Sequence, residues 1–328
     1  MSAVQRIRLP YGFTYLILFL LEVFLLHVLG WLDGTLPRFG FHALNLLFPL
    51  WLWGPLAIMT YLDEVALRAL RDFQPLLGAH RQEVPRLQYE LTTLPARSVV
   101  VSGLLWAAMF LVMMYVGFPV VVRQYSYGPL AIAGAWVLGL SSFVVGSVIY
   151  YHTFRQLRLV SRILSLVERV NLFNLDPVYA FAHLTAQTGA SWLLLGGLNL
   201  IIFPFGLLNF TVVALYVAQV LFALAAFILP LWNAHQRLVA EKRRLLAAVN
   251  RRVEAAIERL HQALDSDDLA WVKEIDTALG GLSSERSVVS SIPTWPWSTA
   301  TFSGFVSALL LPIALFLIQL ALKDWLGF

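Results

Sequence analysis

Seven stretches of about 20 mostly apolar residues dominate this sequence. An α-helix needs about 20 such residues to cross the roughly 30 Å hydrocarbon core of a bilayer. The sequence therefore predicts an all-α, polytopic membrane protein with about seven transmembrane helices. The predicted spans are residues 11–30, 41–62, 98–122, 129–151, 191–210, 211–232 and 299–322.

The composition agrees with this class. Of the 328 residues, 59% are hydrophobic and 13% are charged, whereas soluble domains carry about 25% charged residues. This balance excludes an ordinary soluble enzyme, a disordered regulator and a typical nucleic-acid-binding protein. The chain has no cysteine, so it has neither a disulfide framework nor a thiolate metal site.

The positions of the basic residues predict the orientation. With the N-terminus in the cytoplasm, all but three of the 23 Lys and Arg residues lie on the cytoplasmic side, the exceptions being Arg38, Arg123 and Lys323. An excess of Lys and Arg in cytoplasmic loops determines the topology of membrane proteins. We therefore expect a multi-pass protein of the cell membrane with a cytoplasmic N-terminus and an external C-terminus.

The polar segments of the sequence follow the even-numbered spans. Residues 1–232 are predicted to form a transmembrane bundle of six spans, with amphipathic cytoplasmic connections at 63–97 and 152–189. Residues 233–297 are predicted to form a cytoplasmic helical hairpin, or stalk, and residues 298–328 the seventh transmembrane helix.

The first helix of the stalk is expected to continue span six without a break, and it carries a heptad pattern. Such an apolar seam needs a partner helix. The partner is the returning helix of the hairpin, the helix after span four, or the same helix in another subunit, which would make the protein a homo-oligomer. The returning helix, about residues 269–279, is expected to end at Gly280 and Gly281, since glycine commonly follows helix ends. The seam residues are Leu246, Val249, Val253, Ala256, Leu260 and Ala263.

Four arginines follow span four at spacings of three, four and seven residues, so they share one helical face. They are Arg155, Arg158, Arg162 and Arg169. A basic face at the inner leaflet attracts anionic lipid headgroups by about 1 kcal/mol per residue. The positive-inside rule alone also explains these arginines, so both interpretations stay open.

Glu22 lies near the middle of the first span. Ionisable residues are costly inside a bilayer, which makes them functional hypotheses by default. Two structural alternatives stay open: a neutral Glu22 that hydrogen-bonds a neighbouring helix, or a helix rotated so that Glu22 meets water. Further polar residues that are candidates to line a pathway with Glu22 are His27, Asn45, Asn199, Gln219 and Gln319.

Small residues suggest how two of the spans pack. Ala135, Gly139, Ser142 and Gly146 form one ridge of span four, and small residues at such spacings let helices approach closely. We expect a packing face there, with span three as a candidate partner. Span five is the best candidate for a bent or broken helix, because it contains Gly196, Gly197, Pro204 and Gly206.

The sequence contains no zinc-protease, nucleophile-elbow or phosphate-loop motif, and nothing in it implies a cofactor or a bound metal. We therefore expect no enzymatic activity. Two functions remain open. The first is an oligomeric ion channel or small-solute transporter, with the stalk as its assembly domain and a pathway past Glu22. The second is a non-conducting membrane sensor or scaffold that engages a cytoplasmic protein partner through its helices.

Overall fold

The computed structural model describes residues 10–116, 128–167, 171–202, 210–266 and 269–326. Within these ranges the chain is helical, with short turns and no strand, which confirms the all-α prediction. The helices, with η for a 3-10 helix, are α1 (Tyr11–Leu32), η2 (Ala43–Leu46), α2 (Leu47–Phe73), η3 (Gln74–Glu83), α3 (Val84–Thr92), α4 (Ala96–Val116), α6 (Pro129–Ser165), α7 (Asp176–Ile202), α8 (Phe210–Ile228), η5 (Leu229–Leu231), α9 (Trp232–Asp265), α10 (Leu269–Ser291) and α11 (Thr299–Leu326).

Five helical stretches in the described residues are long and apolar enough to cross a membrane, and they indicate a membrane protein. They are Tyr11–Leu32, Ala43–Tyr115, Pro129–Ser165, Val213–Asp265 and Thr299–Ile318. The second of these stretches contains two of the predicted spans, and the fifth predicted span corresponds to α7, which is not among the five. A count of seven therefore stays a prediction, as does the orientation.

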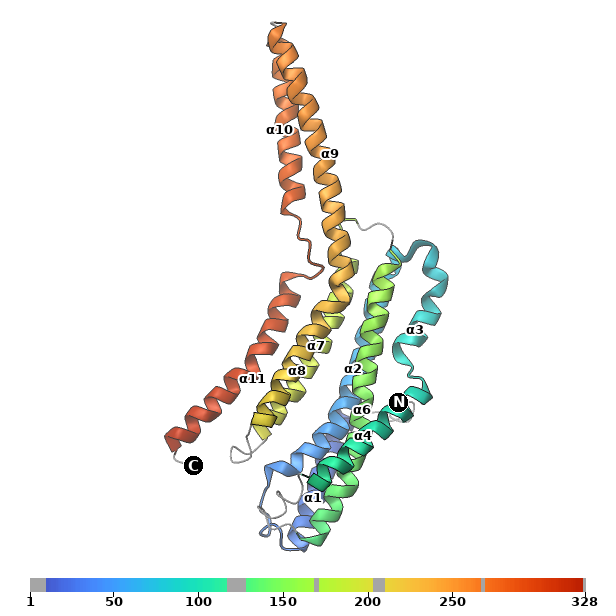
Figure 1. The fold of residues 1–328 in the computed structure, drawn as a ribbon, viewed down its shortest axis with the longest axis vertical. Coiled ribbons are helices and arrows are strands. Elements are labelled where there is room, and N and C mark those ends of the chain that lie inside the picture. Colours follow the sequence, from blue (N-terminus) through green and yellow to red (C-terminus); the bar gives the residue numbers. More distant parts are fainter. Residues whose placement is uncertain (1–9, 117–127, 168–170, 203–209, 267–268, 327–328) are drawn as a thin grey trace.

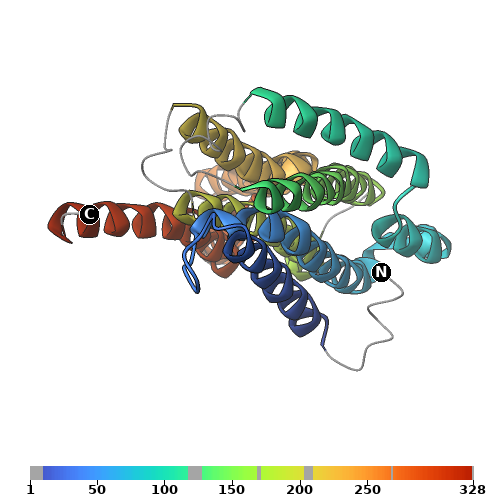
Figure 2. The ribbon, with the colours of Figure 1, turned by 90° about the horizontal axis from the view of Figure 1, so that it is seen from below.

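The α2 helix lies at the centre of the bundle, with α1, α6 and α7 packed around it. In a view along the bundle, α4 and α11 lie at the outside (Figure 2). Leu62, Leu70 and Phe73 of α2 are fully buried, as are Phe181 and Trp192 of α7. These side chains belong to one large apolar core at the junction of α2, α6 and α7.

The small residues of α6 form the packing face that the sequence predicts, and α2 lies against it. A Cβ atom on Gly139 would lie 2.7 Å from the ring of Phe110 on α4, the predicted span three, and 3.0 Å from the ring of Phe48 on α2. One on Gly146 would lie 3.0 Å from the carbonyl oxygen of Trp51 on α2. The hydroxyl of Ser142 donates to the carbonyl of Phe48 at 2.7 Å. Side chains any larger would hold α2 and α6 apart.

The α7 helix continues through Gly196 and Gly197, so it is not broken at this pair. Pro204 and Gly206, on which the prediction of a bent or broken helix also depends, lie outside the described residues. A Cβ atom on Gly196 would lie 2.8 Å from the amide of Gln219 on α8, and one on Gly197 would lie 2.6 Å from Pro312 on α11. The two glycines therefore let two neighbouring helices approach α7.

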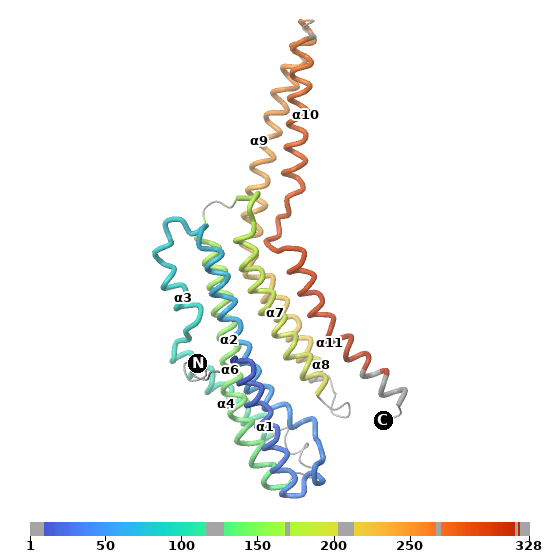
Figure 3. Tube along the Cα trace, turned by 180° about the vertical axis from the view of Figure 1, so that it is seen from behind, coloured from blue at the N-terminus to red at the C-terminus, as the bar shows by residue number. Residues whose placement is uncertain are grey.

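A long hairpin of α9 and α10 projects from the bundle, at the end opposite to the connection between α1 and α2 (Figures 1 and 3). Its apolar seam faces α10: Val249 and Ala263 are buried, and Leu246, Val253, Ala256 and Leu260 are half-buried. Of the three predicted partners, the structure therefore pairs this seam with the returning helix of the same chain, α10.

The prediction that the stalk continues span six without a break is only partly right. α9 is one helix from Trp232 to Asp265, but the 3-10 turn η5 separates it from α8. Pro230 lies in this turn, and proline has no N–H group to continue the α-helical hydrogen bonding.

Stacked aromatic rings join the base of the hairpin to the segment that leads into α11. The ring of His235 on α9 stacks on Trp295 at 3.9 Å between centroids, and Trp295 stacks on Trp297 at 4.4 Å. Nδ1 of His235 lies 3.0 Å from the carbonyl oxygen of Thr294, to which it donates. The base of α9 and the start of α11 are therefore held together.

The α10 helix does not end at Gly280 and Gly281, as the sequence predicts, but continues to Ser291. Glycine costs up to about 1 kcal/mol relative to alanine inside a helix. Ile275 and Val289, on either side of the pair, are buried in the hairpin. Tertiary packing therefore overrides the local preference.

Because a Cβ atom on Gly280 or Gly281 would meet nothing within 4 Å, alanine at either position should stabilise the hairpin. We expect Gly280→Ala and Gly281→Ala each to slow amide hydrogen exchange in α10, with a gain of about 0.5–1 kcal/mol. Gly197→Ala is the matched control, since its new methyl group would collide with Pro312 and should destabilise the protein. Faster exchange in α10 of the Gly280→Ala variant would contradict this account.

Candidate functional site

Glu22 is buried between α1 and α2, where it meets an indole group. The Nε1–H of Trp53 donates to Oε2 of Glu22 at 2.6 Å. The second carboxylate oxygen, Oε1, is buried and has no hydrogen-bond partner among the described residues. The interhelical hydrogen bond that the sequence offers as one interpretation of Glu22 is thus present.

Asn199 and Gln219 lie in different helix contacts. Nε1–H of Trp51 donates to Oδ1 of Asn199 at 2.9 Å, between α2 and α7. Nε2 of Gln219 donates to the carbonyl of Trp192 at 3.0 Å, between α8 and α7. Trp51 and Trp53 are two residues apart on α2, a rotation of about 200°. Asn199 and Glu22 therefore lie on opposite sides of α2, and the structure does not bring them together.

His27 is buried near the end of α1 with both ring nitrogens paired. Nδ1 donates to the carbonyl of Val23 at 2.8 Å, and Nε2 accepts from the backbone N–H of His42 at 3.1 Å. Its ring also stacks on Phe41 at 5.1 Å. These contacts hold the segment that follows α1.

Asn45 is half-buried in η2, at the start of α2. The side chain of Gln319 lies outside the part of the chain that the structure describes.

Two of the four predicted lipid-binding arginines contact protein groups. Arg155 donates to a backbone carbonyl at the C-terminal end of α3, and Arg162 lies 3.7 Å from the carboxylate of Glu90 on α3. Arg158 is exposed, and Arg169 lies outside the described residues. The basic face of α6 therefore partly serves to hold α3.

A polar contact that the sequence analysis missed joins α2 to α6. Nε2 of His152 lies 2.8 Å from Oδ1 of Asp63, and the two residues are 2% and 8% exposed. They are 89 residues apart in the chain, so no local spacing indicates the pair. The one available signal is that each residue directly follows a predicted span.

This contact belongs to a larger group of buried polar residues, the α2–α6 polar cluster, which consists of Asp63, His152 and Gln156. Nδ1 of His152 and both amide atoms of Gln156 are buried without a hydrogen-bond partner among the described residues. Nε1–H of Trp192 on α7 donates to the hydroxyl of Thr153 at 3.1 Å. Each unsatisfied buried group costs about 1–3 kcal/mol, so three such atoms on two successive turns of α6 require an explanation.

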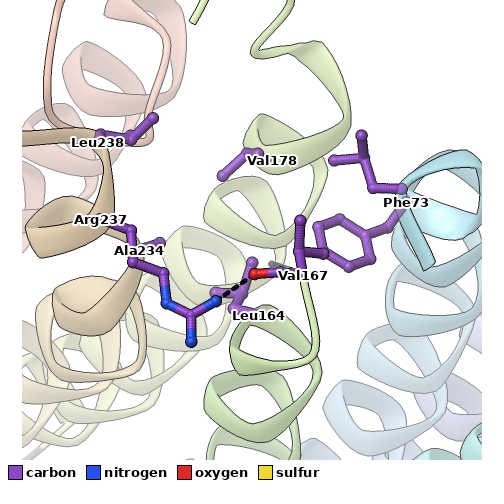
Figure 4. Close-up of a pocket in the computed structure, with 8 residues that line it drawn as sticks. Phe73, Leu164, Val167, Val178, Ala234, Arg237 and Leu238 are labelled. Atoms are coloured by element: carbon purple, nitrogen blue, oxygen red, sulfur yellow. Dashed lines mark hydrogen bonds between the residues drawn. The ribbon is translucent and has the colours of Figure 1, made fainter. Parts of the chain in front are cut away.

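A small cleft on the hairpin side of the bundle lies between α2, α6, α7 and α9 (Figure 4). Apolar side chains such as Phe73 and Val178 line it, together with Arg237 of α9. The Arg237 guanidinium donates to the carbonyls of Val167 and Ser165, at the C-terminal end of α6. A cation is favourable there because the helix dipole places negative partial charge at this end.

Asp33 joins two helices at the opposite end of the bundle. Its Oδ1 accepts from the backbone N–H and the hydroxyl of Thr35, at 3.1 and 2.6 Å, and its Oδ2 accepts from the N–H of Ala131 in the first turn of α6 at 2.8 Å. Burial alone would raise the pKa of Asp33, but these hydrogen bonds outweigh it and hold the pKa below its ordinary value. Asp33 therefore acts as an N-terminal cap of α6 supplied by the end of α1.

No family model, curated protein or solved structure matches this chain. Among the described residues, no three His, Asp or Glu side chains form a group that would hold a metal ion.

Because Glu22 and Asn199 occupy opposite sides of α2, their contributions to stability should be independent. We expect Glu22→Leu and Trp53→Phe to be coupled by about 0.5–3 kcal/mol in a double-mutant cycle, and Trp53→Phe with Asn199→Leu to be additive within about 0.5 kcal/mol. Unfolding of the purified protein measures both cycles. Strong coupling between Trp53→Phe and Asn199→Leu would show that the contacts of Glu22 and Asn199 belong to one site.

The lowered pKa of Asp33 predicts a pH dependence of stability. A carboxylate with a depressed folded-state pKa stabilises the protein above its unfolded pKa of about 3.9, and this contribution is lost as the pH falls through the folded-state value. We expect Asp33→Asn to lower the free energy of unfolding at pH 7 by about 0.5–2 kcal/mol, as for other helix caps. The difference from the unaltered chain should shrink at pH 3, whereas the exposed control Asp276→Asn should show neither effect.

Proposed function

We propose that the chain is a non-conducting membrane sensor or scaffold, without catalytic activity of its own, that engages a protein partner through the α9–α10 hairpin. The observation that carries this proposal is the separation of the intramembrane polar side chains. Glu22, Asn199 and Gln219 each pair within a different helix contact. An ion pathway instead needs polar groups or water arranged along one route.

The hairpin is suited to contact a partner. At 1.5 Å per residue, α9 extends about 50 Å, and its apolar seam is already covered by α10. Its exposed side carries more basic than acidic side chains: Arg243, Arg244, Arg251, Arg252 and Arg259 are exposed, beside the exposed Glu254 and Glu258. Arg244 lies 2.6 Å from Glu241 and Arg252 lies 3.6 Å from Glu285 of α10. A partner protein with an acidic surface fits this face by charge complementarity.

The proposal includes the predicted topology. Seven helices, α1, α2, α4, α6, α7, α8 and α11, cross the cell membrane, and the hairpin and the N-terminus lie in the cytoplasm. Its support is the strong asymmetry of Lys and Arg between the two sides. The exposed Arg158 then lies where anionic headgroups of the inner leaflet would meet it.

One observation favours the other candidate, an oligomeric channel or small-solute transporter. Oε1 of Glu22 is buried and has no partner among the described residues, as expected for a carboxylate that binds an ion or a proton during transport. In that case the hairpin would serve as the assembly domain of a homo-oligomer.

Ion flux into liposomes that contain the purified protein separates the two candidates. We expect no flux of Na⁺, K⁺, Cl⁻ or H⁺ above that of empty liposomes, either for the unaltered chain or for Glu22→Gln. Circular dichroism of the same liposomes controls for folding. Flux that Glu22→Gln alters would contradict the sensor or scaffold function and place Glu22 on a pathway.

Site-specific photo-crosslinking in the native host tests the partner. A crosslinking residue at Ile257, which is 41% exposed, should give one discrete adduct, and charge reversal at Arg251 and Arg252 should abolish it. The same residue in place of Val249, which is buried in the seam, is the matched control. Failure to obtain an adduct at several exposed positions of the hairpin would count against a partner.

A further inference from the structure

We propose that the α2–α6 polar cluster is a proton-binding site, and that proton uptake there is the stimulus of the sensor. The second part of this inference rests on the proposed function. The first part rests on the geometry of Asp63, His152 and Gln156 alone.

The Asp63–His152 pair can hold one proton or two. With one proton, on Nε2 of His152 and directed at Oδ1 of Asp63, the pair carries a net charge of −1. A second proton, delivered by water, forms an N–H bond at Nδ1 and makes the pair neutral overall. A net charge is costly in buried surroundings, and histidine is the side chain that changes its charge between pH 5 and 8. The two groups titrate as one unit.

The three buried atoms without a protein partner, on His152 and Gln156, indicate which kind of ligand fits the cluster. Nδ1 of a His152 that donates from Nε2 is an acceptor, and Gln156 offers one acceptor, Oε1, and one donor, Nε2. A metal cation would satisfy only the acceptors, and an anion only the donor. Water satisfies both kinds, and buried waters commonly bridge such groups. Water at Gln156 would also bring the proton to Nδ1 of His152.

The other charged groups near the cluster are exposed or interact with residues outside it. Asp63 interacts electrostatically with His152. Glu64 and Arg68 of α2 are exposed, Glu64 interacts with Tyr11 of α1, and Arg68 with His183 of α7.

On α6, Arg155 donates to a backbone carbonyl at the end of α3. The proton balance of the cluster is therefore set mainly by Asp63 and His152.

The same helix connects the cluster to the hairpin. α6 continues without interruption from His152 to Ser165, a distance of about 20 Å, and Arg237 of α9 holds its terminal carbonyls. Gain or loss of the negative charge at Asp63 and His152 changes the attraction between α2 and α6. A shift of α6 would then act directly on the base of α9.

Two measurements on the full-length protein in nanodiscs test the inference. Nuclear magnetic resonance of ¹⁵N-histidine, with His152→Gln to assign the signal, follows the protonation of His152. Because the natural chain lacks cysteine, spin labels at Tyr89→Cys on α3 and Ala247→Cys on α9 report the distance between bundle and hairpin without background.

We expect His152 to take up a proton between pH 8 and pH 5, and the distance between the labels to change over the same range. Asp63→Asn should weaken proton binding at His152 at least tenfold and abolish the change in distance. Gln156→Met, which keeps the side-chain volume but removes the amide, should also shift the titration. His183→Gln, at an exposed histidine of α7, should alter neither measurement.

Two results would overturn the inference. A His152 that keeps one protonation state from pH 8 to pH 5 excludes the proton site. A His152 that titrates while the label distance stays constant excludes proton uptake as the stimulus. If Asp63→Asn does not fold, Gln156→Met still decides the first point, and the distance in the unaltered chain decides the second. Failure of the proposed function would show separately, as ion flux into liposomes.

Discussion

The close approach of α2 to α6 is the contact on which the rest of the structure depends. Apolar side chains gain nothing from leaving lipid for a helix interface, so helices in a bilayer associate through close packing and hydrogen bonds. Gly139, Ser142 and Gly146 supply both, since they leave room for α2 and donate one hydrogen bond to its backbone. This approach also brings Asp63 within reach of His152. The polar cluster is thus a consequence of a ridge of small residues.

Tryptophan explains how this bundle accommodates polar side chains at separate helix contacts. An indole buries a large apolar surface and still offers one N–H donor. Trp51, Trp53 and Trp192 each donate this group to a side chain of another helix: Asn199, Glu22 and Thr153 respectively. Each of these three polar residues thereby has a hydrogen-bond donor at its own helix interface. Polar residues in an apolar sequence therefore indicate helix contacts as readily as they indicate transport.

Short-range sequence patterns predict the features of this structure that depend on residues close together in the chain. Hydrophobic length indicated the long helices, and heptad spacing indicated that the seam at Val249 needs a partner. The end of α10 was mispredicted at Gly280, because burial of side chains against α9 outweighs the weak helix preference of glycine. Asp63 and His152 were missed for a related reason. Their contact links residues far apart in the chain, and only the packing of α2 on α6 determines that they meet.

The shape of the hairpin has a mechanical consequence. α9 is a single rigid rod that is held at one end, by Arg237 on α6 and by the stack of His235 on Trp295. A tilt of such a helix pivots about its base, at the surface of the bundle. With a length of about 50 Å, a tilt of about 5° at the base displaces the tip by about 4 Å. Rearrangements too small to open a path through the bundle would thus be amplified into displacements that another protein can detect.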